Sequence, residues 1–341
     1  MSLQFVLVGT GRMGLSHLRA AQNLGLKPVG ICDLRPENLA KAAELAGLSV
    51  SDCYSDPAEL FAKHPGVDLV LIATTADSHR DLVEKAAASG AKAVLCEKPM
   101  ATSVEDCNAM IAACNASGTR LAVNHQMRFM DQYIRVRNEL RSGKFGALGS
   151  MNVVAGCFGL SMNGSHYCEA LRWLTDNEIV SASAWFAPES LKNPRGEQFS
   201  DQAGEVRFET ANGKRLLMSI GADHGHGMTV TYATRFGHIF VDELEGVYLA
   251  TARKPEHQEM PVTRYGMPWD RWEVRFPQAD NVGPTQAVIQ ALLKGEDFPD
   301  GQAGRNAVAA VAAAWQSAEQ GGKPVHVGAT PEYDKKRLPW A

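Results

Sequence analysis

Short apolar runs alternate with amphipathic segments throughout the first 123 residues of the chain. The runs show no period-two alternation with polar residues, which is typical of strands that helices cover on both faces. A regular succession of such strands and helices predicts an α/β fold with a doubly wound parallel sheet. The five predicted strands are Leu3–Val8, Pro28–Cys32, Asp68–Ala73, Ala93–Cys96 and Leu121–Val123.

The pattern changes after about residue 147, where polar and apolar residues partly alternate and turns such as Ala211-Asn212-Gly213 intervene. This favours an α+β domain with a large, mostly antiparallel and open sheet. A length of 341 residues suits two domains of about 150 residues, and we expect them at 1–123 and 124–341. The predicted elements include strands Glu205–Glu209, Arg215–Ile220, Met228–Ala233 and His238–Val241 and helices Ser165–Leu174, Pro284–Leu293 and Ala303–Glu319.

Charge and cysteine usage exclude several classes of function. The chain has 34 Lys and Arg against 38 Asp and Glu, a net charge of −4. Without a basic block, we expect no nucleic acid and no membrane as a partner. The first apolar run is too short for a signal peptide, and no run approaches the roughly eighteen apolar residues of a membrane helix. The seven cysteines contain no Cys-x-x-Cys pair, so a cytoplasmic protein without disulfides or zinc is expected.

A glycine motif lies between the first predicted strand and the following helix. Gly9, Gly11 and Gly14 match G-x-G-x-x-G, with Arg12 and Met13 at the start of the helix. In such a turn the glycines admit a tight bend, a close pyrophosphate and close helix packing, and the helix N-terminus binds the phosphates. This predicts a dinucleotide site of the Rossmann type.

The end of the second predicted strand bears on the choice of dinucleotide. Asp33 follows Gly14 by nineteen residues, close to the spacing of about twenty expected for the acid that binds the ribose hydroxyls. Its charge would repel a 2′-phosphate, which favours NAD. Arg35 lies two residues further on and could hold that phosphate instead. NADP therefore remains the alternative.

Other histidines and aromatic residues give weaker signals. His224 and His226 lie in a glycine turn beside Asp223, and we expect loop residues there and no metal site. His17 on the first helix is most simply a packing residue. One aromatic cluster would suit either a sugar ring or a subunit contact: Tyr265, Trp269 and Trp272.

Four segments in order resemble the glucose-fructose oxidoreductase, inositol dehydrogenase and rhizopine-catabolism family, written Gfo/Idh/MocA. Glu97-Lys98-Pro99 looks like its E-K-P signature, and residues 73–79 look like its turn after the fourth strand. Residues 124–129 resemble its interdomain segment, and residues 164–174 resemble the helix that carries its catalytic histidine. The resemblance runs to about Val327.

The resemblance implies an NAD(P)-dependent oxidoreductase that moves a hydride between nicotinamide and a secondary alcohol or ketone of a sugar, cyclitol or sugar derivative. It further implies a cis Pro99, and a homodimer or homotetramer built through the open face of the second sheet. Lys98 and His166 would be catalytic. The expected cofactor residues are Gly9, Gly11, Arg12, Met13, Gly14, Asp33, Arg35, Thr74, Thr75, His79, Glu97, Lys98 and Gln126. The expected substrate residues are Lys98, Arg128, Asn163, His166 and Trp269, and for Arg128 a structural ion pair is an equally good interpretation.

The chemistry of the two catalytic candidates suits this reaction. An ammonium just past a strand end can stabilise alkoxide character on a substrate oxygen. A histidine with a pKa near 6.5 suits proton transfer at neutral pH. Taken alone, Lys98 would more simply be a solvated surface lysine and His166 a capping or packing residue. Their flanking motifs favour the catalytic interpretation.

One position departs from the family pattern. The family usually has an aspartate four residues before the histidine, where this chain has Met162, with Asn163 beside it. An amide can hydrogen-bond a substrate but cannot act as a base. The departure leaves two further functions open: a redox-neutral NAD-dependent glycosidase or lyase, and an NAD(P)-sensing binding protein without turnover.

Overall fold

The computed structural model describes residues 2–156, 158–189, 191–225, 227–261, 266–278 and 280–341. The contacts between its residues divide the chain into two compact units. Unit 1 consists of Met1–Gln126, Asp280–Ala309 and Pro331–Ala341, and unit 2 of Met127–Ala279 and Ala310–Thr330. Two residues singled out in the sequence, His226 and Tyr265, and one of the seven cysteines, Cys157, lie outside the described residues.

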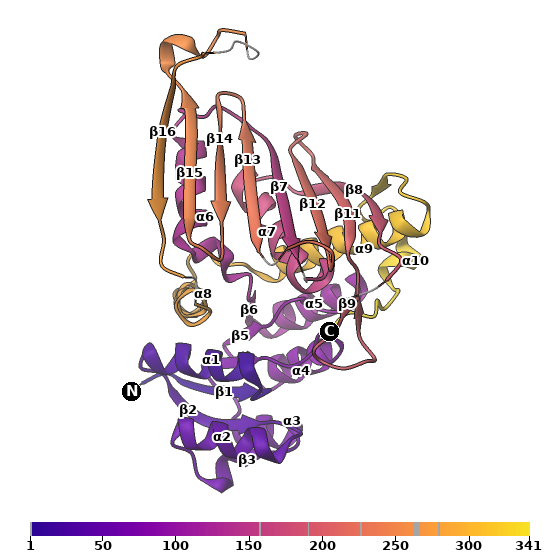
Figure 1. The fold of residues 1–341 in the computed structure, drawn as a ribbon. Coiled ribbons are helices and arrows are strands. Elements are labelled where there is room, and N and C mark those ends of the chain that lie inside the picture. Colours follow the sequence, from indigo (N-terminus) through magenta and orange to yellow (C-terminus); the bar gives the residue numbers. More distant parts are fainter. Residues whose placement is uncertain (1, 157, 190, 226, 262–265, 279) are drawn as a thin grey trace. The chain divides into compact units, whose positions relative to one another are not determined.

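Unit 1 contains a six-stranded sheet in the order β3-β2-β1-β4-β5-β6, in which every neighbouring pair is parallel (Figure 1). This is the strand order of a doubly wound Rossmann sheet. Five strands confirm the predicted runs, and the two-residue β3 carries no run long enough to recognise. The strands are β1 Gln4–Val8, β2 Lys27–Cys32, β3 Cys53–Tyr54, β4 Leu69–Ile72, β5 Ala93–Cys96 and β6 Arg120–Val123.

Helices cover this sheet because its central strands are apolar on both faces: β4 and β5 are buried throughout. Glycine-terminated ends and acidic or Pro starts fit the helices between them, as at α2, which begins at Pro36 and ends before a left-handed Gly47. The intervening helices are α1 Arg12–Asn23, α2 Pro36–Ala46, α3 Pro57–Lys63, α4 Ala76–Ala88 and α5 Val104–Ser117.

Unit 1 also includes segments from the C-terminal third of the chain. Helix α8 (Val282–Lys294) packs against α1. The N–H of Val123 donates to the carbonyl of Pro299 at 2.8 Å. The Trp340 indole is buried and donates to the carbonyl of Ala101 at 2.9 Å. This grouping differs from a single division at residue 123, because distant segments complete the core of the first sheet.

Unit 2 is built on a nine-stranded sheet in the order β16-β15-β14-β13-β7-β12-β11-β8-β17 (Figure 1). Only the β7–β12 pair is parallel among the pairs of this sheet, so the expected mostly antiparallel sheet is confirmed. Its strands are β7 Leu148–Gly156, β8 Ile179–Phe186, β11 Gly204–Thr210, β12 Arg215–Gly221, β13 Met228–Thr234, β14 Gly237–Asp242, β15 Val247–Arg253, β16 Trp269–Arg275 and β17 Val325–His326. A separate short ladder joins β9 Leu191–Lys192 and β10 Ser200–Asp201.

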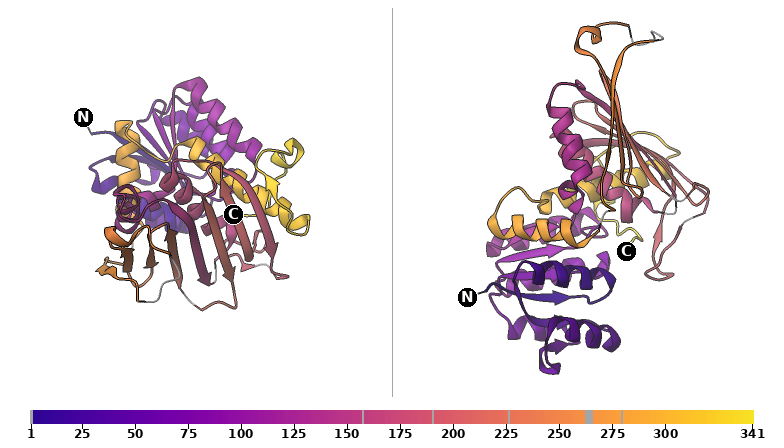
Figure 2. Two further views of the ribbon diagram at one scale, coloured as in Figure 1. Left: turned by 90° about the horizontal axis from the view of Figure 1, so that it is seen from above. Right: turned by 60° about the vertical axis from the view of Figure 1, so that its left-hand side comes forward.

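One face of this sheet is covered by helices, as the two views of Figure 2 show. Alternate residues of β7 point into that core, and Val154 between them is exposed on the other face with Leu217 and Trp185. The remaining helical elements are α6 Asp131–Arg141, α7 Ser165–Thr175, α9 Gly301–Glu319, which continues from unit 1 into unit 2, and the short α10 Pro331–Asp334 in unit 1. In the described part of the chain, no helix has the length and apolarity needed to cross a membrane.

Candidate active site

In the glycine turn after β1, the backbone of unit 1 requires glycine at two of the three glycine positions. Gly9 has a φ of +86°, and a Cβ there would lie 2.7 Å from the carbonyl carbon of Ala73. A Cβ on Gly14 would overlap the carbonyl oxygen of Gly9. Both positions therefore need glycine for the fold itself, since a side chain would push the turn after β1 away from the turn after β4 or away from α1.

Gly11 is different, because a Cβ there would meet no protein atom within 4 Å. It is the N-cap of α1, has a negative φ of −65°, and offers no side-chain cap to the helix. Arg12 and Met13 form the first turn behind it. Protein packing gives no reason for glycine here, whereas a phosphate group approaching the uncapped N–H groups does. The residues of this turn thus fit the pyrophosphate of a dinucleotide.

The carboxylate of Asp33 is held at the same turn. Its Oδ2 accepts the Thr10 N–H at 2.6 Å and the Thr10 hydroxyl at 2.9 Å. Its Oδ1 accepts the Arg35 N–H at 2.9 Å. Arg35 itself is exposed as the N-cap of α2. A carboxylate and a guanidinium therefore both follow β2, as the sequence predicts.

Glu97, directly after β5, is the centre of a buried polar cluster. Its Oε1 lies 2.6 Å from Nε2 of His17 and accepts the Asn124 amide at 2.8 Å. Its Oε2 accepts the N–H of Lys98 at 3.1 Å. Asn124 also donates to the hydroxyl of Thr285 at 3.2 Å. These bonds fix the turn that carries Lys98 at the carboxyl end of the parallel strands.

The charge of Glu97 is stabilised despite its burial. Burial alone would raise the pKa of this carboxyl, but the hydrogen bond and charge of His17, the charge of Lys98 and the Asn124 amide together lower the pKa well below its usual range. The sequence predicts a packing role for His17. The residue is fully buried, but its ring is also the partner of Glu97, and an ionisable residue on the buried face of α1 was the signal for this.

His79 connects the turn after β4 with the turn after β5. Its Nδ1 lies 3.1 Å from the carbonyl of Pro99, and its Nε2 lies 3.3 Å from the carbonyl of Thr74. Burial lowers the pKa of this ring. The Lys98–Pro99 bond is cis, as the resemblance implies. His79 thus contacts the backbone of the predicted cofactor residue Thr74 and of Pro99, which follows Lys98, with Thr75 as the N-cap of α4 beside it.

Apart from Lys98, the residues predicted for the substrate lie in unit 2. His166 is buried at the start of α7, directly after a π-helical turn, η3 (Leu160–Gly164). Asn163 lies in that turn, and its N–H donates to the carbonyl of Gly159 at 3.1 Å. π-helical turns are rare and are frequent at functional sites. Lys98 and His166 belong to different units.

Arg128, in the 3₁₀ turn η2 (Gln126–Phe129), forms a buried ion pair with Glu169 of α7. Glu169 also accepts from Arg172 at 2.6 Å. The sequence leaves Arg128 open to either a substrate contact or a structural ion pair. In the structure its guanidinium is engaged by the helix that carries His166, since Glu169 lies one turn after it. Gln126, predicted to contact the cofactor, is buried in unit 1.

Trp269 is not brought together with His166. Trp269 pairs with Arg253 in the register of β15 with β16. Followed across β14 and β13, the registers place it at the same height in the sheet as the first residue of β7. The chain enters η3 after the last residue of β7, and nine residues of strand span about 26 Å. Trp269 is the first residue of β16, an edge strand of the sheet. The sequence predicts an aromatic cluster in this region but no strand.

A second buried polar cluster lies beside His166. Glu243, after β14, accepts the hydroxyls of Tyr133 and of Tyr167, the latter at 2.9 Å. Burial raises the pKa of this carboxyl to about 7, although both hydroxyls oppose the shift. Tyr167 follows His166 on α7, so this cluster fixes the same end of the helix.

The raised pKa of Glu243 predicts a dependence of stability on pH. The unfolded carboxyl ionises near 4.5 and the folded one at about 7, so folding becomes less favourable as pH rises between these values. The full shift would be worth about 3 kcal/mol; because Glu243 retains some solvent contact, we expect about 2 kcal/mol. Urea unfolding at pH 5 and pH 8 should show this loss in the wild type and not in Glu243→Gln. The exposed control Glu245→Gln should keep the wild-type loss. An equal loss in the wild type and Glu243→Gln, or absence of the loss in Glu245→Gln as well, would contradict the assignment.

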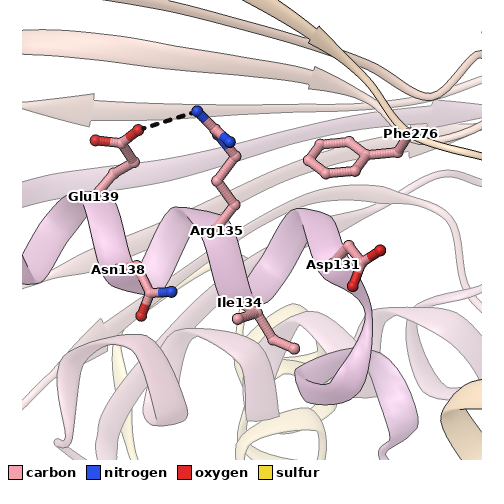
Figure 3. A pocket seen from close by; sticks show the side chains of 6 residues that line it. All are labelled: Asp131, Ile134, Arg135, Asn138, Glu139 and Phe276. Atoms are coloured by element: carbon pink, nitrogen blue, oxygen red, sulfur yellow. Dashed lines mark ion pairs between the residues drawn. The ribbon is translucent and has the colours of Figure 1, made fainter.

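Two hollows lie away from these residues. One of about 390 Å³ is lined by residues of α6 and by Phe276 (Figure 3). Arg135 and Glu139 form an ion pair of 3.6 Å at its edge. The other, about 500 Å³ in unit 1, lies near Arg120 and Asp300. Neither is lined by a predicted site residue. Among the described residues, no group of three His, Cys, Asp or Glu side chains could hold a metal ion.

Comparison with known proteins agrees with this geometry. Residues 3–125 match the family model described as "Oxidoreductase family, NAD-binding Rossmann fold" (Gfo/Idh/MocA). The D-apiose dehydrogenase of Paraburkholderia graminis is 38% identical over 41% of this chain and only 36% of its own length. The inositol 2-dehydrogenase of Rhizobium meliloti is 25% identical over 93% of this chain and 97% of its own.

Solved structures show the same fold over nearly the whole chain. An aldose-aldose oxidoreductase from Caulobacter crescentus is 22% identical and has a TM-score of 0.76 over 96% of this chain and 100% of its own. A levoglucosan dehydrogenase is 19% identical and has a TM-score of 0.78 over 96% of this chain and 99% of its own. With the glycine turn, the Glu97-Lys98-Pro99 turn and the family match in agreement, residues 3–125 are an NAD-binding Rossmann domain of the Gfo/Idh/MocA oxidoreductase type, and the chain is similar over nearly its whole length to proteins named as dehydrogenases.

Proposed function

We propose that the protein is a dehydrogenase that oxidises a secondary alcohol of a sugar, cyclitol or sugar derivative with NAD. The observation that carries this is the placement of Lys98. Its turn is anchored by buried Glu97 at the same edge of the parallel sheet as the turn of Gly11, the edge where doubly wound sheets bind their ligands. The names of the relatives, D-apiose dehydrogenase and inositol 2-dehydrogenase, support carbohydrate or cyclitol substrates.

In this proposal Lys98 and His166 handle the substrate oxygen and its proton. When bound, the cofactor supplies a hydride acceptor. Lys98 donates a hydrogen bond to the substrate oxygen and stabilises the negative charge that develops there. His166 takes the hydroxyl proton as the C–H bond breaks and the carbonyl forms. The turn of Gly11 and the carboxylate of Asp33 bind the pyrophosphate and the ribose hydroxyls.

Cofactor titration and a substrate screen test the proposal. We expect NAD to bind more tightly than NADP, because the Asp33 carboxylate repels a 2′-phosphate. A panel of sugars, sugar acids and cyclitols is then screened for NADH absorbance. NADH formed in proportion to product supports net oxidation, whereas product without net NADH indicates the redox-neutral alternative.

Substitution of the two catalytic candidates completes the test. Lys98→Met and His166→Ala should each lower kcat by about 100-fold or more while NAD affinity changes little. Lys92→Met and His238→Ala, at exposed positions, are the matched controls and should keep full activity. Full turnover in both Lys98→Met and His166→Ala on the identified substrate would contradict the mechanism.

A further inference from the structure

The turn that precedes His166 is held by a carboxylate from a distant part of the chain. Asp201, in β10, is buried, and its Oδ1 and Oδ2 accept the N–H groups of Ser161 and Met162, each at 2.8 Å. Its Oδ1 also accepts the N–H of Gln202 at 2.9 Å. The N–H of Leu160 donates to the carbonyl of Gln202, again at 2.9 Å. Three consecutive N–H groups of η3 thus have their acceptors in residues 201 and 202.

This turn needs such acceptors because the first N–H groups of a helix have no partner within it. The N-cap residue of η3, Gly159, has no side chain to supply one. A Cβ at Gly159 would overlap the carboxylate of Asp201. Glycine at 159 and aspartate at 201 therefore fit each other: the first leaves the space that the second occupies.

The bond network leads directly to His166. The π-helical turn is continuous with α7, and His166 follows Met162 by four residues. On the C-terminal side of His166, two contacts hold the first turns of α7: Tyr167 with Glu243, and Glu169 with Arg128. On the N-terminal side of His166, residues 201 and 202 supply the acceptors for the three N–H groups of η3 described above. A shift of η3 would therefore rotate or displace the start of α7.

We propose that Asp201 is a positioning residue for the proton-transfer group His166. The carboxylate that the family pattern has at the position of Met162 is absent there, and Asp201 instead holds Met162 by its backbone. Facing N–H groups, Asp201 acts as an acceptor that sets the path of the turn and not as a base. This inference rests on the proposed function, because placement of the ring matters to turnover only if His166 transfers the proton.

Two substitutions disturb this carboxylate in independent ways. Asp201→Asn keeps one acceptor and turns an amide NH₂ toward the other N–H, while Gly159→Ala keeps the carboxylate and pushes it away. Each should lower kcat by about 10- to 100-fold, the effect of misplacing a reacting group by up to about 1 Å, with the KM for NAD unchanged. The double variant should lose no more than the worse single variant, because both act on one contact.

Asp280→Asn is the matched control. The Asp280 carboxylate also accepts two backbone N–H groups, those of Val282 and Gly283 at 2.6 and 2.7 Å, but at the exposed start of α8. Its kcat should equal that of the wild type. Thermal unfolding of all variants sets a temperature at which each is folded. Full kcat in folded Asp201→Asn and Gly159→Ala, or effects that add in the double variant, would overturn the inference.

A readout independent of turnover separates this inference from the proposed function. In protein labelled with ¹⁵N-histidine, the ring signals of His166 are identified by their loss in His166→Ala. They should shift, and titrate at a different pH, in Asp201→Asn and Gly159→Ala but not in Asp280→Asn. If Lys98→Met and His166→Ala both keep full activity, the proposed function fails while this measurement still decides the placement. If the ring signals are unchanged, the positioning role of Asp201 is wrong.

Discussion

Alanine in place of Gly11 should weaken NAD binding by about 10- to 100-fold, the cost of one methyl group forced into a packed contact, while the protein stays as stable as the wild type. The reason is that a Cβ at Gly11 meets no protein atom within 4 Å, so only a ligand can meet it. Titration with NADH by fluorescence gives the affinity, and thermal unfolding gives the stability. Unchanged affinity would remove the basis for placing the pyrophosphate at this turn.

Gly14→Ala is the matched comparison at the same turn. Its Cβ would overlap the carbonyl oxygen of Gly9, and a backbone atom cannot move aside as a flexible side chain does. We expect a loss of about 3 kcal/mol or more in the free energy of unfolding, at the upper end for overpacking. A Gly14→Ala protein as stable as Gly11→Ala would show that the two glycines do not have these separate roles.

Arg128→Met should lower the free energy of unfolding by about 3 kcal/mol, because it leaves the buried carboxylate of Glu169 without its buried partner. The value is at the low end for breaking a buried pair, since Arg172 still bonds Glu169. Arg128→Met combined with Glu169→Leu should recover most of the loss. Urea unfolding of the three proteins measures these differences.

Arg141→Met provides the control for Arg128→Met. Arg141 pairs with Asp176 at 2.9 Å, with both side chains more than half exposed, and such surface pairs contribute less than about 1 kcal/mol. If Arg128→Met lost no more stability than Arg141→Met, the buried pair would not be what fixes η2 to α7.

The parallel sheet was predictable because strands that are buried on both faces consist of continuous apolar residues, as in β4 and β5. The glycine turn was predictable for a related reason: its residues are adjacent in sequence. Strand β16 was not recognised, because its residues alternate between exposed and partly buried at a sheet edge, and only its aromatic residues stood out. The two-residue strand β3 carries too few residues for any pattern.

The polar partners within the site were harder to predict, because they come together across long stretches of chain. His17 meets Glu97 across 80 residues, and Asp201 meets Met162 across 39. No spacing rule connects such residues before the fold is known. Arg128 illustrates the same limit: the sequence leaves a substrate contact and a structural ion pair equally open, and only the fold shows Glu169 beside its guanidinium.

The burial of Trp340 against Ala101 has a consequence for how the protein is made. Residues 331–341 leave the ribosome later than any residue of unit 2, yet they belong to the unit that begins with β1. Unit 2 has all of its residues by Thr330. During synthesis, therefore, the first sheet is translated early but gains its final contacts only after the whole of unit 2 has emerged.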